Sequence, residues 1–171
     1  MKKLLIVVDY QKDFVDGALG FPGAEKLALP IQEKIESYRG RGDEVVFTFD
    51  THGADYLETQ EGKYLPVPHC REGSDGWELY PPLEVRPGER TFHKPAFGSA
   101  ELFDYLRQGE YESIELVGLV SSICVISNAV LAKAACPETP VLVDGTCTAG
   151  HDPQLHAAAM KVMAGLQIQI I

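Results

Sequence analysis

Four side chains with acid–base or nucleophilic chemistry stand at the ends of predicted strands: Asp9, Asp50, Lys94 and Cys124. Ligands of open parallel sheets bind beyond the carboxyl ends of the strands, so we expect these four residues to share one edge. Taken singly, an aspartate often caps a turn, a lysine is often a solvated loop residue, and a cysteine often fills a core. Their common edge favours a functional site.

Cys124 is the candidate nucleophile. It lies near the start of a predicted helix, where the helix dipole lowers the pKa of a thiol and favours the thiolate. A nearby lysine would add to this effect, and a carboxylate would accept the proton during attack. Asp9, Lys94 and Cys124 therefore supply a base, an electrostatic stabiliser and a nucleophile. The backbone N–H groups of residues 121–124 are candidates for an oxyanion hole.

Asp50, His52, Glu61 and His69 form a second candidate group. If the chain after the second strand is extended, Asp50 and His52 point to the same side, as two ligands of one ion must. Two imidazoles and two carboxylates suit Zn, Fe or Mn. Alternatively, Asp-x-His occurs here by chance, and Glu61 and His69 are surface residues of a loop.

Short apolar runs alternate with helical patterns, which is typical of a parallel sheet with crossover helices. We predict one domain over residues 1–171, of α/β class. It has three layers, with a doubly wound, mainly parallel six-stranded sheet and helices on both faces. The predicted strands are Leu4–Val8, Val45–Phe49, Arg90–His93, Ser113–Leu119, Val141–Val143 and the alternating edge segment 166–170.

The helical segments carry further expectations. Gly40 should end the first long helix, Ser99 and Asp152 should cap later ones, and the apolar helix up to about 135 should be deeply buried. Residues 51–88 show little periodicity and form one long excursion, a kind of segment that is often functional. The last helix should bury one face, made of Leu155, Ala158, Ala159, Val162, Met163 and Leu166. The remaining histidines are interpreted as structural: His93, His151 and His156.

The composition is that of an ordinary globular protein with a net charge of −10. This acidity argues against partners such as nucleic acid and anionic membranes. The apolar run that follows Lys3 is too short for a secretory signal, and no stretch approaches the ~18 apolar residues of a membrane span. We expect a cytoplasmic protein with four free cysteines, the alternative being two disulfides in a secreted chain.

Several motifs resemble those of the isochorismatase-like cysteine hydrolases and, within that superfamily, the nicotinamidases. Asp-Tyr-Gln-Lys-Asp-Phe at 9–14 is similar to the opening motif, and Gly-Leu-Val-Ser-Ser-Ile-Cys-Val at 118–125 to the nucleophile motif. The segments 49–52 and 61–70 resemble the nicotinamidase metal segment, and Phe-His-Lys-Pro at 92–95 resembles the segment with the catalytic lysine. The resemblance covers essentially the whole chain.

This resemblance implies roles for individual residues. Asp9 would be the base, Lys94 the catalytic lysine and Cys124 the nucleophile, with the N–H groups of Ser121 and Cys124 as the oxyanion hole. A cis peptide, which in the family precedes that hole, would fall at Val120–Ser121. A divalent metal ion would orient the substrate, and Phe14 and Val120 would contact it. The implied ligands of the metal are Asp50, His52, Glu61 and His69.

The implied enzyme is a hydrolase of a linear amide C–N bond that converts nicotinamide to nicotinic acid and ammonia in NAD salvage. The alternative is another isochorismatase-like hydrolase, acting on a different small amide or on isochorismate. Two departures leave the substrate open: Ser122 where many relatives carry an acid, and Thr51 where many nicotinamidases carry Trp. Relatives are often oligomeric, so we expect a homo-oligomer.

Two other classes are less consistent with the sequence. A non-catalytic scaffold would not need Asp9, Lys94 and Cys124 together. A nucleotide- or flavin-binding module would need a glycine-rich turn after the first strand, where this chain has Asp-Tyr-Gln.

Overall fold

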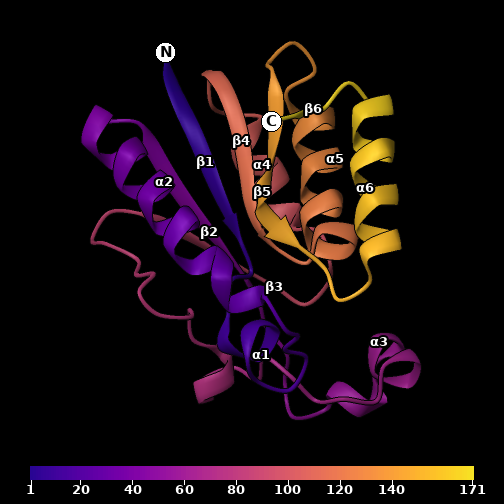
Figure 1. The fold of residues 1–171 in the computed structure, drawn as a ribbon. Coiled ribbons are helices and arrows are strands. Elements are labelled where there is room, and N and C mark those ends of the chain that lie inside the picture. Colours follow the sequence, from indigo (N-terminus) through magenta and orange to yellow (C-terminus); the bar gives the residue numbers. More distant parts are fainter.

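The computed structural model describes residues 1–171, which form one six-stranded sheet with the order β3-β2-β1-β4-β5-β6 (Figure 1). Every neighbouring pair of strands is parallel, so the predicted doubly wound α/β fold is confirmed. The order reverses between β1 and β4, and open parallel sheets generally bind ligands beyond the carboxyl ends of the strands at such a point. The strands are β1 (Lys2–Val8), β2 (Glu44–Asp50), β3 (Arg90–Lys94), β4 (Tyr111–Leu119), β5 (Val141–Ala149) and β6 (Gln169–Ile170).

Helices cover both faces of the sheet, and this explains the continuous apolar run in β1. Successive side chains of a strand point to opposite faces. Leu5 and Val7 pack in the core beneath α2, whereas Leu4 and Ile6 pack in the core beneath α4, α5 and α6. None of the helices combines the length and apolar character needed to cross a bilayer. The helices are α1 (Lys12–Val15), α2 (Ala28–Arg41), α3 (Gln60–Tyr64), α4 (Ala100–Leu106), α5 (Ile126–Ala135) and α6 (Pro153–Gly165).

The helix ends follow local sequence signals. The Ser99 hydroxyl accepts the N–H of Leu102 at 3.0 Å, and the Asp152 carboxylate caps α6 ahead of Pro153, as predicted. The predicted end of α2 at Gly40 is wrong. The helix continues to Arg41, and Gly42, with φ 74°, supplies the left-handed residue that ends it.

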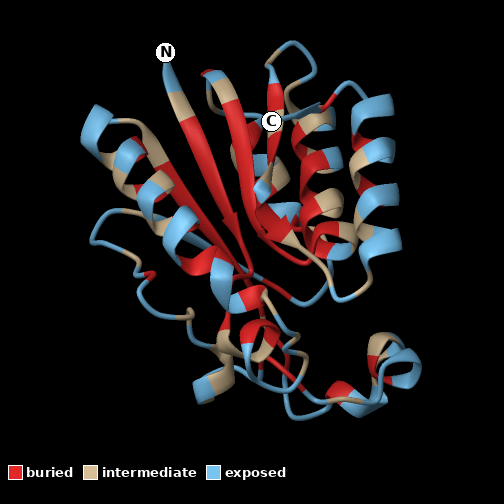
Figure 2. Cartoon of the chain, in the orientation of Figure 1, coloured by how far each residue is buried: buried red, intermediate tan, exposed pale blue.

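The outer helices bury narrower faces than predicted. On α6, Ala159 and Met163 are buried, but Leu155, Val162 and Leu166 are about half exposed. Figure 2 shows the outward side of α6 as mostly exposed. On α5, Val130 is likewise exposed, so this helix is not deeply buried on all sides. Each helix lies on the sheet as an outer layer, and only the stripe that faces the sheet is covered.

The long excursion 51–88 connects β2 to β3. It contains α3 and two short 3-10 turns, Tyr56–Glu58 and Asp75–Trp77. Its first part, with α3, lies together with α1 beyond the carboxyl ends of the central strands, and its last residues run back beside α2 to the start of β3 (Figure 1). The excursion therefore encloses the edge at which the candidate residues meet.

Candidate active site

Asp9, Lys94 and Cys124 meet at the carboxyl edge of the sheet. The Nζ atom of Lys94 lies 2.6 Å from Oδ2 of Asp9 and 3.6 Å from Sγ of Cys124, and all three residues are buried. Asp9 follows β1, Lys94 is the last residue of β3, and Cys124 belongs to a π-helical turn, Ser121–Val125, after β4. Parallel pairing of strands distant in sequence thus brings a carboxylate, an ammonium and a thiol into contact.

Burial dominates the protonation of these groups. It raises the pKa of the Cys124 thiol well above its ordinary value, Asp9 adds to the rise, and Lys94 opposes it. The expected net lowering of the Cys124 pKa is therefore wrong, because burial of the thiol, with the charge of Asp9 added to it, outweighs the positive charge nearby. Burial also raises the pKa of Asp9, against the opposing effect of Lys94. The site holds a protonated thiol beside a carboxylate that is more basic than an exposed aspartate.

Lys94 keeps its charge in this buried setting. Burial by itself would lower the pKa of the Lys94 ammonium, but the negative charges around it, first that of Asp9, outweigh burial and raise the pKa. A second carboxylate, Asp50, lies 3.6 Å from the ammonium. The fixed positive charge therefore lies between the thiol and two acids.

The turn after β4 places Val120 and Ser121 next to Cys124. The cis peptide bond is Leu119–Val120, so the position Val120–Ser121 carried over from the family motif is one residue too late. The cis bond thus joins the last residue of β4, Leu119, to Val120, the residue before the π-helical turn. Ser121 opens the π-helical turn, where backbone N–H groups have no partner within the helix.

Three supporting residues were missed by sequence reasoning. The Thr48 hydroxyl donates to Asp9 Oδ1 at 2.6 Å, and the Asn128 amide donates to the Cys124 carbonyl at 2.8 Å. His156, interpreted as structural from the sequence, lies with Nδ1 2.9 Å from the Ser121 hydroxyl. A signal existed for Thr48 and Asn128, since each is a polar residue within an apolar run and a buried polar group needs a partner.

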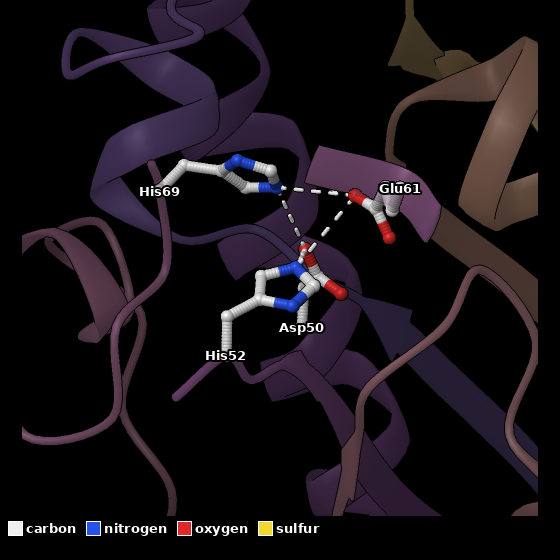
Figure 3. A group of neighbouring side chains, drawn as sticks. All are labelled: Asp50, His52, Glu61 and His69. Atoms are coloured by element: carbon white, nitrogen blue, oxygen red, sulfur yellow. Dashed lines mark hydrogen bonds and ion pairs between the residues drawn. The ribbon is translucent and has the colours of Figure 1, made fainter. Parts of the chain in front are cut away.

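The four candidate metal ligands converge on one point, as Figure 3 shows. Their nearest ligand atoms all lie within 4.8 Å of one another. Oδ2 of Asp50 is 2.9 Å from Nε2 of His52 and 3.2 Å from Nε2 of His69. Oε1 of Glu61 lies 3.7 Å and 3.6 Å from the same two nitrogens. Two residues of the excursion, Glu61 and His69, thus meet the end of β2, and neither is a plain surface residue.

The donor set fits a divalent metal such as zinc. The Nδ1 atom of His69 lies 2.8 Å from the carbonyl of Val67, which can only accept a hydrogen bond. In the neutral imidazole this leaves the lone pair of Nε2 directed toward the other ligands, the arrangement a metal-binding histidine needs. Burial by itself would raise the pKa of Asp50, but hydrogen bonds with His52 and His69 outweigh it and hold the pKa below its ordinary value.

A small apolar cavity of about 50 Å³ joins the two groups. Its lining includes Cys124 and three of the candidate metal ligands, Asp50, Glu61 and His69. The cavity is otherwise lined by apolar side chains: Phe14, Leu19, Leu65, Phe97, Val120 and Ile123. Phe14 also packs edge-on against His69, with ring centroids 5.6 Å apart.

Comparison with known proteins gives consistent relatives. The chain is 29% identical over 185 residues to the nicotinamidase/pyrazinamidase of Mycobacterium tuberculosis, covering 99% of this chain and 98% of the relative. A crystal structure of the pyrazinamidase of Pyrococcus horikoshii in complex with zinc superposes with a TM-score of 0.88 at 25% identity, covering 100% and 99% of the two chains. The crystal structure of nicotinamidase/pyrazinamidase from Bacillus subtilis superposes with a TM-score of 0.87 at 28% identity, covering 99% of each chain.

A family model described as the isochorismatase domain matches residues 3–171. The match includes all six strands and both groups of candidate residues. The chain therefore belongs to the isochorismatase family.

Proposed function

We propose that the protein is a metal-containing cysteine amidohydrolase that converts nicotinamide to nicotinic acid and ammonia. The observation that carries the proposal is a single cavity whose lining brings together Cys124 and three of the four candidate metal ligands, with apolar side chains elsewhere. A planar ring with an amide at one end and a nitrogen lone pair at the other matches this lining. Relatives named nicotinamidase support the proposal, including one from Escherichia coli that is 27% identical over 95% of this chain and 91% of its own length.

The charges around the cavity favour an uncharged substrate. Lys94 is the only cation near the thiol, and it is paired with Asp9 at 2.6 Å. Asp50 and Glu61 add further negative charge to the lining. The bound metal would be the only cation left to pair with a substrate carboxylate, so the second carboxylate of a dicarboxylic acid would be buried without a partner, which is costly. This argues against isochorismate, a dicarboxylic acid, as the substrate.

The proposed reaction begins with proton transfer from Cys124 to Asp9. The resulting thiolate attacks the amide carbon and forms a tetrahedral oxyanion. Protonated Asp9 then donates its proton to the amide nitrogen, the C–N bond breaks, and ammonia leaves an acyl thioester on Cys124. The charge of Lys94 stabilises the carboxylate before the transfer and the thiolate after it.

The backbone N–H groups of Ser121 and Cys124 are the proposed donors to the oxyanion. The hydrogen bonds of Asn128 to the Cys124 carbonyl and of His156 with the Ser121 hydroxyl hold this turn from two helices. An oxyanion-hole donor is worth about 3 kcal/mol in other hydrolases.

Hydrolysis of the thioester completes the cycle. Asp9 accepts a proton from water, the hydroxide attacks the acyl carbon, and the C–S bond breaks. Cys124 leaves as a thiolate and regains its proton from Asp9, so both groups return to their starting states.

The residues proposed to hold the metal are Asp50, His52, Glu61 and His69. When bound, the metal would supply a Lewis-acid contact for the ring nitrogen and so orient the amide toward Cys124. Phe14 and Val120 line the space between the two ends and are the proposed ring contacts.

Substrate entry requires the rim of the cavity to open. The cavity of about 50 Å³ is far smaller than the roughly 300–1,000 Å³ of typical ligand pockets. Leu65, Phe97 and Ile123 line it and are each more than a third exposed, so their side chains are free to rotate. We expect these three side chains to move when the ring binds.

In the cell, we propose a cytoplasmic enzyme of NAD salvage that forms a homo-oligomer. The exposed apolar side chains Leu155 and Val162 of α6 supply a surface for a second copy. Residues 153–171 contain none of the 25 acidic residues of the chain, so two such faces would not repel each other. Light scattering of the wild type and of Val162→Glu tests this point, since a dimer through α6 should be lost in the variant.

The test of the reaction is incubation of the metal-loaded protein with nicotinamide and detection of nicotinic acid and ammonia. Replacing Cys124 with Ala should abolish turnover while leaving the fold intact by circular dichroism. Trapping of an acyl-enzyme at Cys124 by rapid acid quench and mass spectrometry would identify the thioester. Turnover of Cys124→Ala near the wild-type rate would refute the nucleophile assignment.

A panel of substrates separates the alternatives. Other small neutral amides should be scored by ammonia release and isochorismate by pyruvate release. A chain that releases pyruvate from isochorismate faster than ammonia from nicotinamide would refute the charge argument. The panel should include N-carbamoylsarcosine, because an N-carbamoylsarcosine amidase from Thermoplasma acidophilum superposes with a TM-score of 0.82 at 26% identity, covering 99% of this chain and 95% of that chain.

A further inference from the structure

The opening motif 9–14 contains two further polar side chains, Gln11 and Asp13, besides the proposed base Asp9. Gln11 and Asp13 alternate with Asp9 along the chain, and neither touches the thiol or the cavity. Both side chains instead bind backbone groups of the segments that carry the proposed metal ligands.

Gln11 is fully buried, and its side chain forms hydrogen bonds with the backbone at the end of β2. Its Oε1 accepts the N–H of Asp50 at 2.8 Å, and its Nε2 donates to the Asp50 carbonyl at 2.9 Å. The same Nε2 donates to the carbonyl of Trp77 at 2.8 Å. One side chain therefore satisfies both backbone groups of a ligand residue and ties it to the far end of the excursion.

Asp13 holds the other segment. Its Oδ2 accepts the N–H of Cys70 at 2.7 Å, and Cys70 follows the ligand His69 directly. The backbone of Cys70 has φ 43°, a left-handed conformation that is uncommon for a residue with a side chain. The carbonyl of Cys70 in turn accepts the N–H of His52 at 3.0 Å. The Asp13 carboxylate thus fixes the residue that links the two histidine segments.

Gly76 indicates how closely Asp13 is enclosed. A Cβ atom at Gly76 would lie 2.3 Å from the carboxylate atoms of Asp13, so a side chain at this position would displace the carboxylate. Gly76 has no positive φ, so alanine fits its backbone. A Gly76→Ala change would move Asp13 without altering any ligand.

We propose that Gln11 and Asp13 are positioning residues of the metal centre, which set the separation of Asp50 from the two histidines. This rests on the proposed metal site. Without these hydrogen bonds, fewer contacts would connect the end of β2 to the excursion. The ligand atoms of Asp50, His52 and His69 would then be held less firmly at the distances that one metal ion requires. Preorganisation of this kind raises metal affinity. Ligands that are already ordered in the metal-free protein cost no further free energy of ordering when the metal binds.

The test measures zinc affinity of metal-free protein by competition with a chromophoric chelator. Asp13→Ala, Gln11→Ala and Gly76→Ala should each bind zinc about 10- to 100-fold more weakly than the wild type. Asp13→Asn keeps one acceptor oxygen and should lose less. Gly40→Ala is the matched control, since a Cβ there meets nothing within 4 Å, and its affinity should be unchanged.

Thermal unfolding of the metal-free proteins separates positioning from a structural role. Unchanged zinc affinity in folded Asp13→Ala and Gly76→Ala would overturn the proposal, even if their metal-free stability falls. If Asp13→Ala does not fold, the zinc affinities of Gly76→Ala and Asp13→Asn test the proposal in its place. A wild-type protein that binds no zinc would instead overturn the metal site itself.

Discussion

Thr48 offers a quantitative test of the electrostatics around Asp9. Its hydroxyl donates to Asp9 Oδ1 at 2.6 Å, and both residues are fully buried. Thr48→Val keeps the shape and the strand preference of the side chain but removes the donor. A hydrogen bond to a charged group contributes about 1.5–3 kcal/mol, so we expect the free energy of unfolding at neutral pH to fall by about that amount.

The same change should move the pKa of Asp9. Burial is the main cause of the raised pKa of this carboxyl, and the Thr48 hydrogen bond is one of the effects that restrain it. Removing the bond should raise the pKa of Asp9 further, because the ionised carboxylate loses a hydrogen-bond donor. Because Asp9 must be ionised to act as base, the acid limb of the pH profile of kcat/KM should move to higher pH.

The assays are urea denaturation at several pH values and the pH profile of nicotinamide hydrolysis. The stability difference between Thr48→Val and wild type should shrink at pH values low enough to protonate Asp9. Thr148→Val is the matched control, because the buried Thr148 hydroxyl has no hydrogen-bond partner and its loss should not destabilise the fold. Equal stability of the two variants, or an unmoved acid limb in Thr48→Val, would refute the reasoning.

Three further predictions concern the backbone at Gly118, an ion pair on the face of the sheet covered by α2, and the metal. Gly118 has φ 112° and a Cβ there would lie 2.0 Å from the Val8 carbonyl oxygen, so Gly118→Ala should lose at least about 2 kcal/mol in urea denaturation. Burial opposes ionisation of Asp144, but the ion pair with Lys34 and the hydrogen bonds from Thr146 together outweigh it and hold the Asp144 pKa below its ordinary value. Such an acid stabilises the fold above its unfolded pKa, so Asp144→Asn should be less stable at neutral pH. The gap should close as the pH falls below about 4, and a constant gap would contradict the pairing. Zinc at 100 times its Kd should stabilise the wild type by about 2.7 kcal/mol in thermal unfolding, an increment that a chelator removes and that His52→Ala should lack.

Local signals in the sequence were enough to predict the six strands, the longer helices and the fold, but not the short helices α1 and α3. The apolar run of β1 is continuous because helices cover both of its faces, and continuity is visible without coordinates. The caps at Ser99 and Asp152 depend on neighbouring residues only, so they too were predictable. The convergence of Asp9, Lys94 and Cys124 followed from topology, since parallel strands end at one edge.

Which side chains are buried, and which charges surround them, could be learned only from the tertiary structure. The apolar stripe of α6 is visible in the sequence, but which of its residues meet the sheet depends on how the helix lies on its neighbours. The raised pKa of Cys124 results from burial and from Asp9, which is more than a hundred residues away in the chain. The contacts of Gln11 and Asp13 with the metal segments likewise join distant residues. A sequence records which groups are present and their local periodicity, whereas desolvation and pairing depend on distances between atoms that only the folded chain brings together.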